Sequence, residues 1–260
     1  MLIKRSGSMS RLKAAGTHLL ISGCIVIAVL LIMYFLWYPS EYFALMGGKR
    51  LMTVLASVDV FLGPLLTFCI FKGGKKGLKF DLVCIGLVQL AALSYGVYVM
   101  FQARPVFTVF NKNQFQISAL VEISPDELSK AKKTKWKKLS VTGPELVAIG
   151  IPNKQNKREY MFAMVVGAQA YRYPSLYEDY NEYRSEVIKV GKSLAGLSAD
   201  SSENKATIDQ FLGQVNRPAT DFLVLPISSE LAEMSAIVDA KTGDFIEIID
   251  AKPKAVSHQK

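Results

Sequence analysis

The sequence predicts a membrane protein in which a three-helix transmembrane bundle is followed by a small α+β periplasmic domain. Half of the 260 residues are hydrophobic, yet the first 101 hold only three of the 22 Asp and Glu residues. Those 101 residues contain three apolar stretches of about 20 residues, the length that crosses a bilayer. Residues 102–260 carry the remaining 21 Lys and Arg and 19 Asp and Glu, a balance typical of a soluble domain. We therefore predict a membrane domain over 1–101 and a periplasmic domain over 102–260.

The three predicted spans cover residues 17–38, 51–71 and 82–101. The first apolar run is longer than a signal-peptide core and no small-residue cleavage site closes it, so we expect an uncleaved anchor. Met9 is an alternative start to Met1. It would leave Arg11 and Lys13 ahead of the first span, and the predicted topology would not change.

Basic residues in the short loops predict the orientation. Eight lie before the first span or between the second and third, whereas only Lys49 and Arg50 lie between the first and second. The positive-inside rule then places the N-terminus in the cytoplasm and the domain after the third span in the periplasm. We expect a multi-pass protein of the inner membrane whose surroundings are the lipid bilayer, and the basic excess reflects this topology rather than nucleic-acid binding. Four aromatic residues suit the outer interface: Trp37, Tyr38, Tyr42 and Phe43.

Asp59 is the unusual residue of the spans. It lies eight residues into the second one, about 12 Å below the outer boundary at the rise of an α-helix. A carboxyl group inside a bilayer is costly unless it is protonated, paired or hydrated, so it is a functional candidate. Ser94 and Tyr95 come level with it along the third span, whereas His18 is expected at another depth. Two interpretations stay open, a structural hydrogen bond between helices and a contact with a transmembrane helix of another protein.

Gly63 and Pro64 follow Asp59 by about one turn. Proline lacks a backbone donor and clashes with the preceding turn, so we expect a kink in the second span. The carbonyl group that loses its partner needs another one inside a membrane, which favours packing against neighbouring helices.

The outer domain is predicted to mix strands and helices. Strands are expected at residues 106–110, 115–121, 146–151, 160–166, 234–240 and 245–250, and helices at 125–133, 177–190 and 205–215. Ser124 is the expected N-cap of the first of these helices. The tail from Ala251 onward is polar and is predicted to be mobile. Strands at both ends with helices between them are typical of an α+β sandwich.

Two side-chain patterns in this domain have open interpretations. Six lysines surround Trp136 within residues 130–138, which indicates either a solvated segment or a contact with anionic lipid or an acidic partner. Tyr177, Tyr180 and Tyr183 have helical spacing, which more often marks a packed face than a ligand site.

The distribution of reactive residues disfavours an enzyme. All three cysteines (Cys24, Cys69, Cys84) fall in the spans, and the only outer histidine is His258 in the tail. Nucleophilic triads and His-rich metal sites therefore have no constellation, and no P-loop or dinucleotide-binding glycine motif is present. Acids are plentiful, but nothing nominates a carboxylate pair for glycoside chemistry. We expect no cofactor, no metal and no catalytic residues, and a binding function.

Four short motifs, in this order around three spans, resemble the type IV pilin accessory proteins of Gram-negative bacteria (the TfpX/TfpZ type). They are Trp37–Tyr38–Pro39, Asp59-x-x-x-Gly63–Pro64–Leu65–Leu66–Thr67, Arg104–Pro105–Val106 and Gly143–Pro144. The likeness covers the membrane part closely and the outer domain more loosely. It implies a helper for type IV pilus assembly that is neither a pilin nor a motor component.

The resemblance implies that the partners are the major pilin and inner-membrane pilus assembly proteins. A pilin waits in the inner membrane with its apolar helix embedded and its head outside, which matches three spans and an outer domain. The candidate pilin-helix contact, or interhelical polar site, comprises Asp59, Gly63, Pro64, Ser94 and Tyr95. The alternative from another class is an envelope sensor or transport-associated subunit with a periplasmic ligand-binding domain. The short cytoplasmic segments leave little surface for its output.

Overall fold

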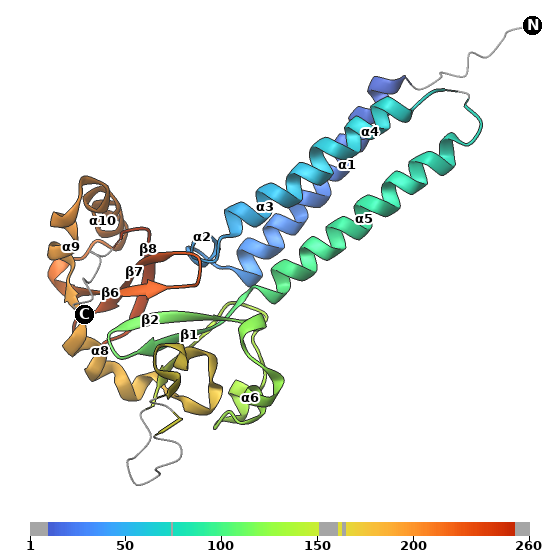
Figure 1. Cartoon of the computed structure of the whole chain (residues 1–260). Coiled ribbons are helices and arrows are strands. Elements are labelled where there is room, and N and C mark those ends of the chain that lie inside the picture. Colours follow the sequence, from blue (N-terminus) through green and yellow to red (C-terminus); the bar gives the residue numbers. More distant parts are fainter. Residues whose placement is uncertain (1–9, 74, 151–160, 163–164, 253–260) are drawn as a thin grey trace, which may run out of the picture. The chain divides into compact units, whose positions relative to one another are not determined.

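A computed structural model of the chain describes residues 10–73, 75–150, 161–162 and 165–252. The chain divides into two compact units, Met1–Tyr34 with Gly48–Phe101 and Phe35–Gly47 with Gln102–Lys260 (Figure 1). The first unit holds the long apolar helices and the second holds a mixed β-sheet. Residues 35–47, which we assigned from the sequence to the membrane domain, are thus part of the unit that contains the sheet.

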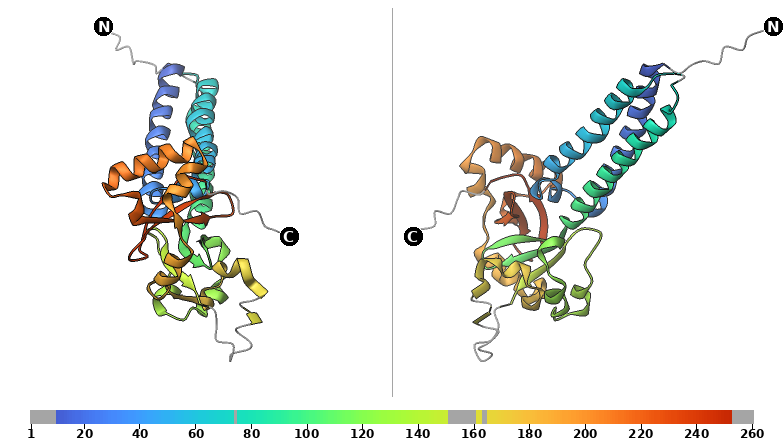
Figure 2. Two further views of the ribbon diagram at one scale, coloured as in Figure 1. Left: turned by 90° about the vertical axis from the view of Figure 1, so that its left-hand side faces the viewer. Right: turned by 45° about the vertical axis from the view of Figure 1, so that its right-hand side comes forward.

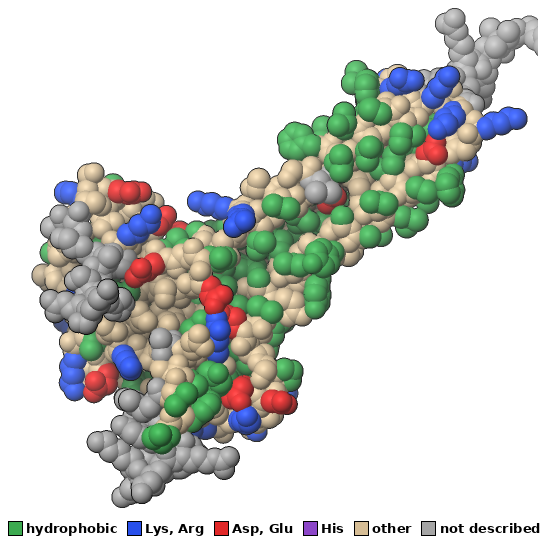
Figure 3. All heavy atoms as spheres, in the orientation of Figure 1, with side chains coloured by type: hydrophobic (Ala, Val, Ile, Leu, Met, Phe, Trp, Pro, Cys, Tyr) green, Lys and Arg blue, Asp and Glu red, His purple; other side chains and the backbone are tan. Residues whose placement is uncertain are grey.

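Within the described part of the chain, three helices are long and apolar enough to cross a membrane: Arg11–Trp37, Gly48–Ile70 and Leu78–Gln102. Their number and approximate positions agree with the predicted spans. Helix α1 (Arg11–Ile32) begins where the Ser10 side chain accepts a hydrogen bond from the Lys13 amide, and it continues into π-helical turns at Met33–Trp37. Figure 3 shows hydrophobic side chains along these helices and Lys and Arg side chains at the end that carries the α4–α5 loop.

The second long helix is irregular near its centre. It consists of α3 (Gly48–Ala56), a π-helical segment η2 (Ser57–Leu62) and α4 (Gly63–Ile70), with Pro64 in the first turn of α4. Because Pro64 has no N–H, the carbonyl group one turn earlier has no helical donor, and the chain widens just before it. The irregularity expected at Gly63 and Pro64 therefore takes the form of π-helical turns, and Asp59 lies within them.

The long helices pack unevenly. Helix α1 lies beside α4 and η2, and the His18 Nδ1 and Thr67 Oγ1 atoms form a hydrogen bond of 2.6 Å between α1 and α4. Helix α5 (Leu78–Gln102) is the least buried of the three. Helix α5 meets the second long helix at two glycines. A Cβ atom on Gly96 of α5 would meet Leu55 of α3, and one on Gly63 of α4 would meet Gln89 of α5.

The second unit contains a mixed sheet with the strand order β4-β3-β1-β2-β6-β7-β8, in which the short β5 also pairs with β6. The strands are β1 (Pro105–Asn111), β2 (Gln114–Ala119), β3 (Glu145–Ile149), β4 (Tyr177–Asp179), β5 (Lys192–Ser193), β6 (Phe222–Ser228), β7 (Glu233–Asp239) and β8 (Phe245–Ile249). The β1–β2 and β7–β8 hairpins are antiparallel, as predicted. Strands β2 and β6 join the two halves of the sheet in parallel through only two residue pairs, Phe115 with Ile227 and Gln116 with Ser228.

Each half of the sheet has its own core. Beside β1 and β3, Trp136 is fully buried and donates from Nε1 to Glu145 at 3.1 Å. The lysines around this tryptophan lie at the surface, and four of the six form ion pairs: Lys130 with Glu127, Lys132 with Glu178, Lys133 with Asp179, and Lys135 with Glu145. The Lys130–Lys138 segment is thus anchored by its tryptophan, and most of its charges are balanced locally.

The second core lies under α9 (Leu194–Asp200) and α10 (Ser202–Val215), which pack beside β6 and β8 (Figures 1 and 2). Phe211 and Phe222 meet edge to face there, with ring centroids 5.1 Å apart. Helix α10 confirms the prediction at 205–215 and starts earlier, because the Ser201 side chain caps it by accepting from the Asn204 amide. The short α6 (Pro125–Ser129) has the predicted Ser124 cap, but it ends before the lysines.

Residues 35–47 are held against the sheet by buried side chains and hydrogen bonds. Tyr38 is fully buried, and the Tyr42 hydroxyl lies 2.7 Å from the Thr108 hydroxyl of β1. The Leu45 carbonyl, in helix α2 (Tyr42–Leu45), accepts a hydrogen bond of 2.6 Å from the Ser229 hydroxyl in the β6–β7 loop. Two of the aromatic residues that we assigned to the lipid interface therefore pack within the protein.

Two secondary-structure predictions in this unit are wrong. The expected helix at 177–190 starts as β4, which pairs with β3 at the sheet edge, passes through a 3-10 turn (Tyr180–Tyr183), and becomes α8 only at Arg184–Val190. Tyr177 and Tyr180 are buried, so these tyrosines pack within the protein as predicted, although they do not lie on one face of a helix. The expected strand at 160–166 is helical at 161–162 and 165–166. Its other residues, the polar stretch 153–158 and the tail from 253 lie outside the described residues.

Strand β6 was not predicted at all. Its apolar sequence contains Pro226, which disfavours a central strand because proline cannot donate to the ladder. Pro226 lies where one side of β6 changes its partner strand. Val224, before the proline, pairs with β5, and Ile227, after it, pairs with β2.

Phe115 should be critical for joining the two halves of the sheet. It is fully buried, and its ring lies 5.2 Å from that of Phe245 and 6.1 Å from that of Tyr180. Phe115→Ala is expected to lower the free energy of unfolding by about 3–5 kcal/mol, measured by denaturant titration in detergent. Ile246→Ala, at a 40% exposed position, serves as the control and should cost less than about 1 kcal/mol. Equal losses for the two variants would contradict this account.

Candidate functional site in the apolar helices

Two grooves meet at Asp59. The first, of about 350 Å³, lies between α3 and α5. It is lined by Arg50, Leu51, Val54, Leu55, Asp59, Ala92, Leu93, Tyr95, Gly96, Val99 and Met100. The second, of about 240 Å³, lies between α1 and α5 and includes His18, Ser22, Gln89 and again Asp59. Asp59 and Leu93 line both grooves, so the carboxyl group lies where the two adjoin.

The Asp59 carboxyl group is buried without a partner. Its residue is 5% exposed, and neither Oδ1 nor Oδ2 has a hydrogen-bond partner among the described residues. From α5, Gln89 Nε2 donates to the backbone carbonyl of Asp59 instead, at 3.5 Å. Burying a polar group without a hydrogen bond is costly, and more so where lipid replaces water. The carboxyl group of Asp59 can therefore form hydrogen bonds with a polar group that enters the groove.

The predicted site residues are only partly brought together. Gly63 and Pro64 begin α4 next to Asp59, and Gly63 lies against Gln89. Ser94 is exposed, and Tyr95 is 70% exposed at the rim of the first groove. Neither hydroxyl bonds to Asp59, so the expected internal partner is absent from the described residues.

The depth of Asp59 explains this difference. The second helix starts at Gly48 rather than at residue 51, so Asp59 lies almost a turn deeper than expected. Gln89 then comes nearest to it on α5, and its own Oε1 atom is also buried without a partner in the described part of the chain. Our sequence reasoning missed Gln89. The available signal was that Gln89 is the only amide side chain within the predicted third span.

The polar groups of this arrangement can form hydrogen bonds to a ligand. One carboxyl group and one amide in apolar walls can exchange hydrogen bonds with a polar group of an apolar ligand. Among the described residues, no group of three or more His, Cys, Asp or Glu is positioned to hold a metal ion. His18 also lines the second groove, but its ring nitrogen bonds to Thr67.

Comparisons with known proteins identify the family. The family profile described as fimbrial assembly protein FimB matches residues 7–47. A fimbrial assembly protein of serogroup E1 from Dichelobacter nodosus is 31% identical over 235 residues, which cover 87% of this chain and 90% of the relative. This chain belongs to the fimbrial assembly protein family.

Two further family members from the same organism are similar to the chain. The fimbrial assembly protein of serogroup I is 29% identical over 87% of this chain and 90% of its own length. That of serogroups C1 and C2 is 37% identical over 122 residues, which cover 46% of this chain and 92% of the relative. No solved structure matches the chain. The profile match covers α1 and the segment 35–47 of this chain, which are a long apolar helix and the segment that packs on the sheet.

Replacing Asp59 should stabilise the helices. Because its carboxyl group is buried without a hydrogen bond, Asp59→Leu is expected to raise the free energy of unfolding in detergent by about 1–3 kcal/mol. Thr67→Val is the matched control, since Thr67 is equally buried but bonded to His18, and it should be destabilising. A functional residue is often kept at a cost to stability. A strong loss of stability in Asp59→Leu would mean that the carboxyl group has an internal partner.

Proposed function

We propose that this protein is an accessory protein for type IV pilus assembly that binds the major pilin in the inner membrane before or during polymerisation. The observation that carries this proposal is the buried carboxyl group of Asp59, which lines an open groove and has no hydrogen-bond partner among the described residues. Membership of the fimbrial assembly family supports the process. The proposal assigns no catalytic activity and no cofactor to the chain.

The groove between α3 and α5 suits one additional apolar helix. Helices in lipid associate through close packing and hydrogen bonds rather than through the hydrophobic effect, so small residues and polar groups mark their contacts. Here Ala92, Gly96 and Asp59 all line the groove. A helix with a hydrogen-bonding side chain at this depth would satisfy the carboxyl group. The embedded helix of a pilin, with its head outside the membrane, supplies such a partner.

The sheet domain is proposed to lie in the periplasm, where a pilin head is also located. The basic residues of the short loops support this orientation. Alkaline phosphatase fused after Lys252 should be active, whereas a fusion within the α4–α5 loop should be inactive. The opposite pattern would show the reverse topology, in which the sheet domain and the pilin head lie on opposite sides of the membrane. The sensor or transport alternative gains no support from the fold, because the α4–α5 loop between Ile70 and Leu78 is short.

Photo-crosslinking in cells tests the groove directly. A photoreactive residue at Val54 or Ala92, which line the first groove, is expected to capture the major pilin. Asp59→Leu should reduce capture about fivefold or more, since one interhelical hydrogen bond in lipid contributes roughly 1 kcal/mol.

Val83 and Leu87 on α5 are the matched control positions, because both are more than half exposed and neither lines the described grooves. They should capture lipid or unrelated proteins. Pilin capture that is equal at all four positions, or unchanged by Asp59→Leu, would exclude the groove as the binding site.

A further inference from the structure

The three points at which the chain passes between the apolar helices and the sheet domain are each covered by a loop of that domain. Gly143, at a φ angle of +76°, packs on Pro39 so closely that a Cβ atom there would lie 3.0 Å from the Pro39 ring. Leu231 covers Gly47, at a φ angle of +70°, where a Cβ atom would lie 2.8 Å from the Leu231 side chain. The Arg104 backbone carbonyl accepts a hydrogen bond from the Leu120 amide at 3.0 Å.

Each covering loop exposes a large apolar side chain. Leu231 is 66% exposed, although its end touches Gly47. Val121 follows Leu120 and is 69% exposed. Val141 is 52% exposed and follows Ser140, whose carbonyl accepts from the Arg104 Nε atom at 3.3 Å. Exposed apolar residues are common singly, but three on the three loops that contact the helix ends form a pattern.

Chain geometry places these loops at the level of a membrane surface. Pro39 and Arg104 are two residues beyond the ends of long apolar helices, and Gly47 immediately precedes one. Consecutive Cα atoms are 3.8 Å apart, so all three lie within about 8 Å of a helix end. If the helices span a bilayer with their ends at the hydrocarbon boundary, these residues lie in or just beyond the headgroup region, which adds about 5–7 Å on each side of the hydrocarbon core.

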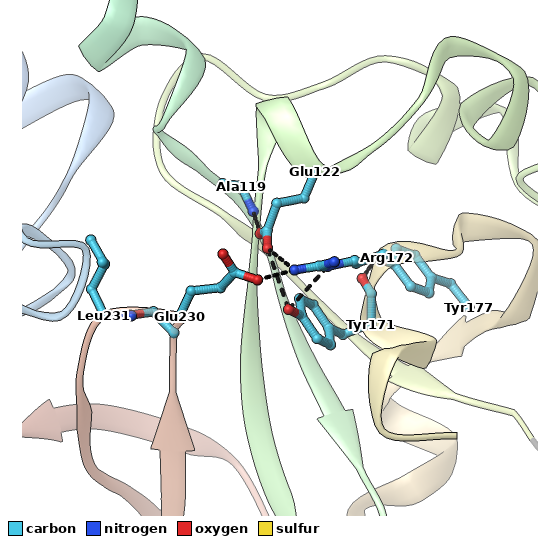
Figure 4. A network of polar contacts seen from close by, with 8 residues as sticks. Ala119, Glu122, Tyr171, Arg172, Tyr177, Glu230 and Leu231 are labelled. Atoms are coloured by element: carbon cyan, nitrogen blue, oxygen red, sulfur yellow. Dashed lines mark hydrogen bonds and ion pairs between the residues drawn. The ribbon is translucent and has the colours of Figure 1, made fainter. Parts of the chain in front are cut away.

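The two carboxylates beside these apolar residues share one arginine, which leaves one net negative charge. Glu122 follows Val121, Glu230 precedes Leu231, and Arg172 forms ion pairs with both carboxylates, at 3.0 Å in the case of Glu122 (Figure 4). The Tyr171 hydroxyl also donates to Glu122, at 3.3 Å, and burial and this carboxylate raise the pKa of Tyr171, so that the hydroxyl remains a donor. Carboxylates that would repel anionic lipid are thereby paired within the protein. The exposed Lys49 and Arg50, next along the chain from Gly47, attract phosphate groups.

We propose that Val121, Val141 and Leu231 insert into the outer lipid interface and rest the sheet domain on the bilayer. Apolar side chains next to basic residues are the usual composition of an interfacial contact. The occupant of this surface is therefore the lipid itself, rather than the pilin or a second copy of the chain.

Lipid quenching in proteoliposomes tests this contact without any pilin. The full chain carries Cys24→Ala, Cys69→Ala and Cys84→Ala, with one new cysteine at position 121, 141 or 231 that bears an NBD fluorophore. Asn113→Cys is the control, because the exposed Asn113 follows β1 at the end away from Arg104, about 20 Å along seven extended residues. Vesicles of phosphatidylethanolamine and phosphatidylglycerol with brominated acyl chains should quench the three positions about twofold or more, and the control little.

Two results would overturn the proposal. Quenching at the three positions no greater than at Asn113 would show that they face water. Blue-shifted emission without quenching would show that protein, and not lipid, covers them. Leu231→Asp should lower the quenching measured at position 141, whereas Leu231→Ile should preserve it. These outcomes are independent of pilin capture from the groove, so either proposal can fail without the other.

Discussion

The absence of a single backbone donor, the N–H of Pro64, shapes the second apolar helix and much that surrounds it. Its loss leaves a carbonyl group without a helical partner, the helix widens over Ser57–Leu62, and Asp59 lies in the widened turns. A carboxyl group facing the interior, with α5 held at a distance, requires a partner that the described part of the chain does not contain. The candidate binding site is therefore a consequence of helix geometry as much as of one acidic residue.

The sheet domain has a comparable dependence on a few contacts. Its two halves are joined in the sheet by only two parallel residue pairs, and Phe115 and the Arg172 ion pairs reinforce that junction from different sides. Each half has its own core and its own covering helices. The domain thus consists of two packed halves joined at the β2–β6 junction. The few side chains at this junction should contribute more to the stability of the domain than their number suggests.

Sequence reasoning recovered the features that depend on local patterns. Apolar length located the long helices, alternation and turn residues located both hairpins, and Ser124 marked the start of α6. It failed where tertiary contacts decide the conformation. Tyr177 is in a strand because β3 offers an edge, and β6 tolerates Pro226 because its partner changes there. At the site, Asp59 and Gly63 were identified, but Gln89 was not, because a shift of helix start by three residues cannot be read from composition.

The packing of residues 35–47 on the sheet has a consequence for biosynthesis. This segment leaves the ribosome early, whereas the β6–β7 loop that binds it through Ser229 and Leu45 lies 184 residues further along the chain. Contacts between such distant residues form slowly, and helices inserted first have to wait for them. During synthesis this loop can contact Thr108 of β1 and Gly143 first, and its hydrogen bond to Ser229 can form only after β6 has been made. Chains that stop short of β6 keep the contact between Tyr42 and Thr108 of β1, but they leave the Leu45 carbonyl without its Ser229 donor.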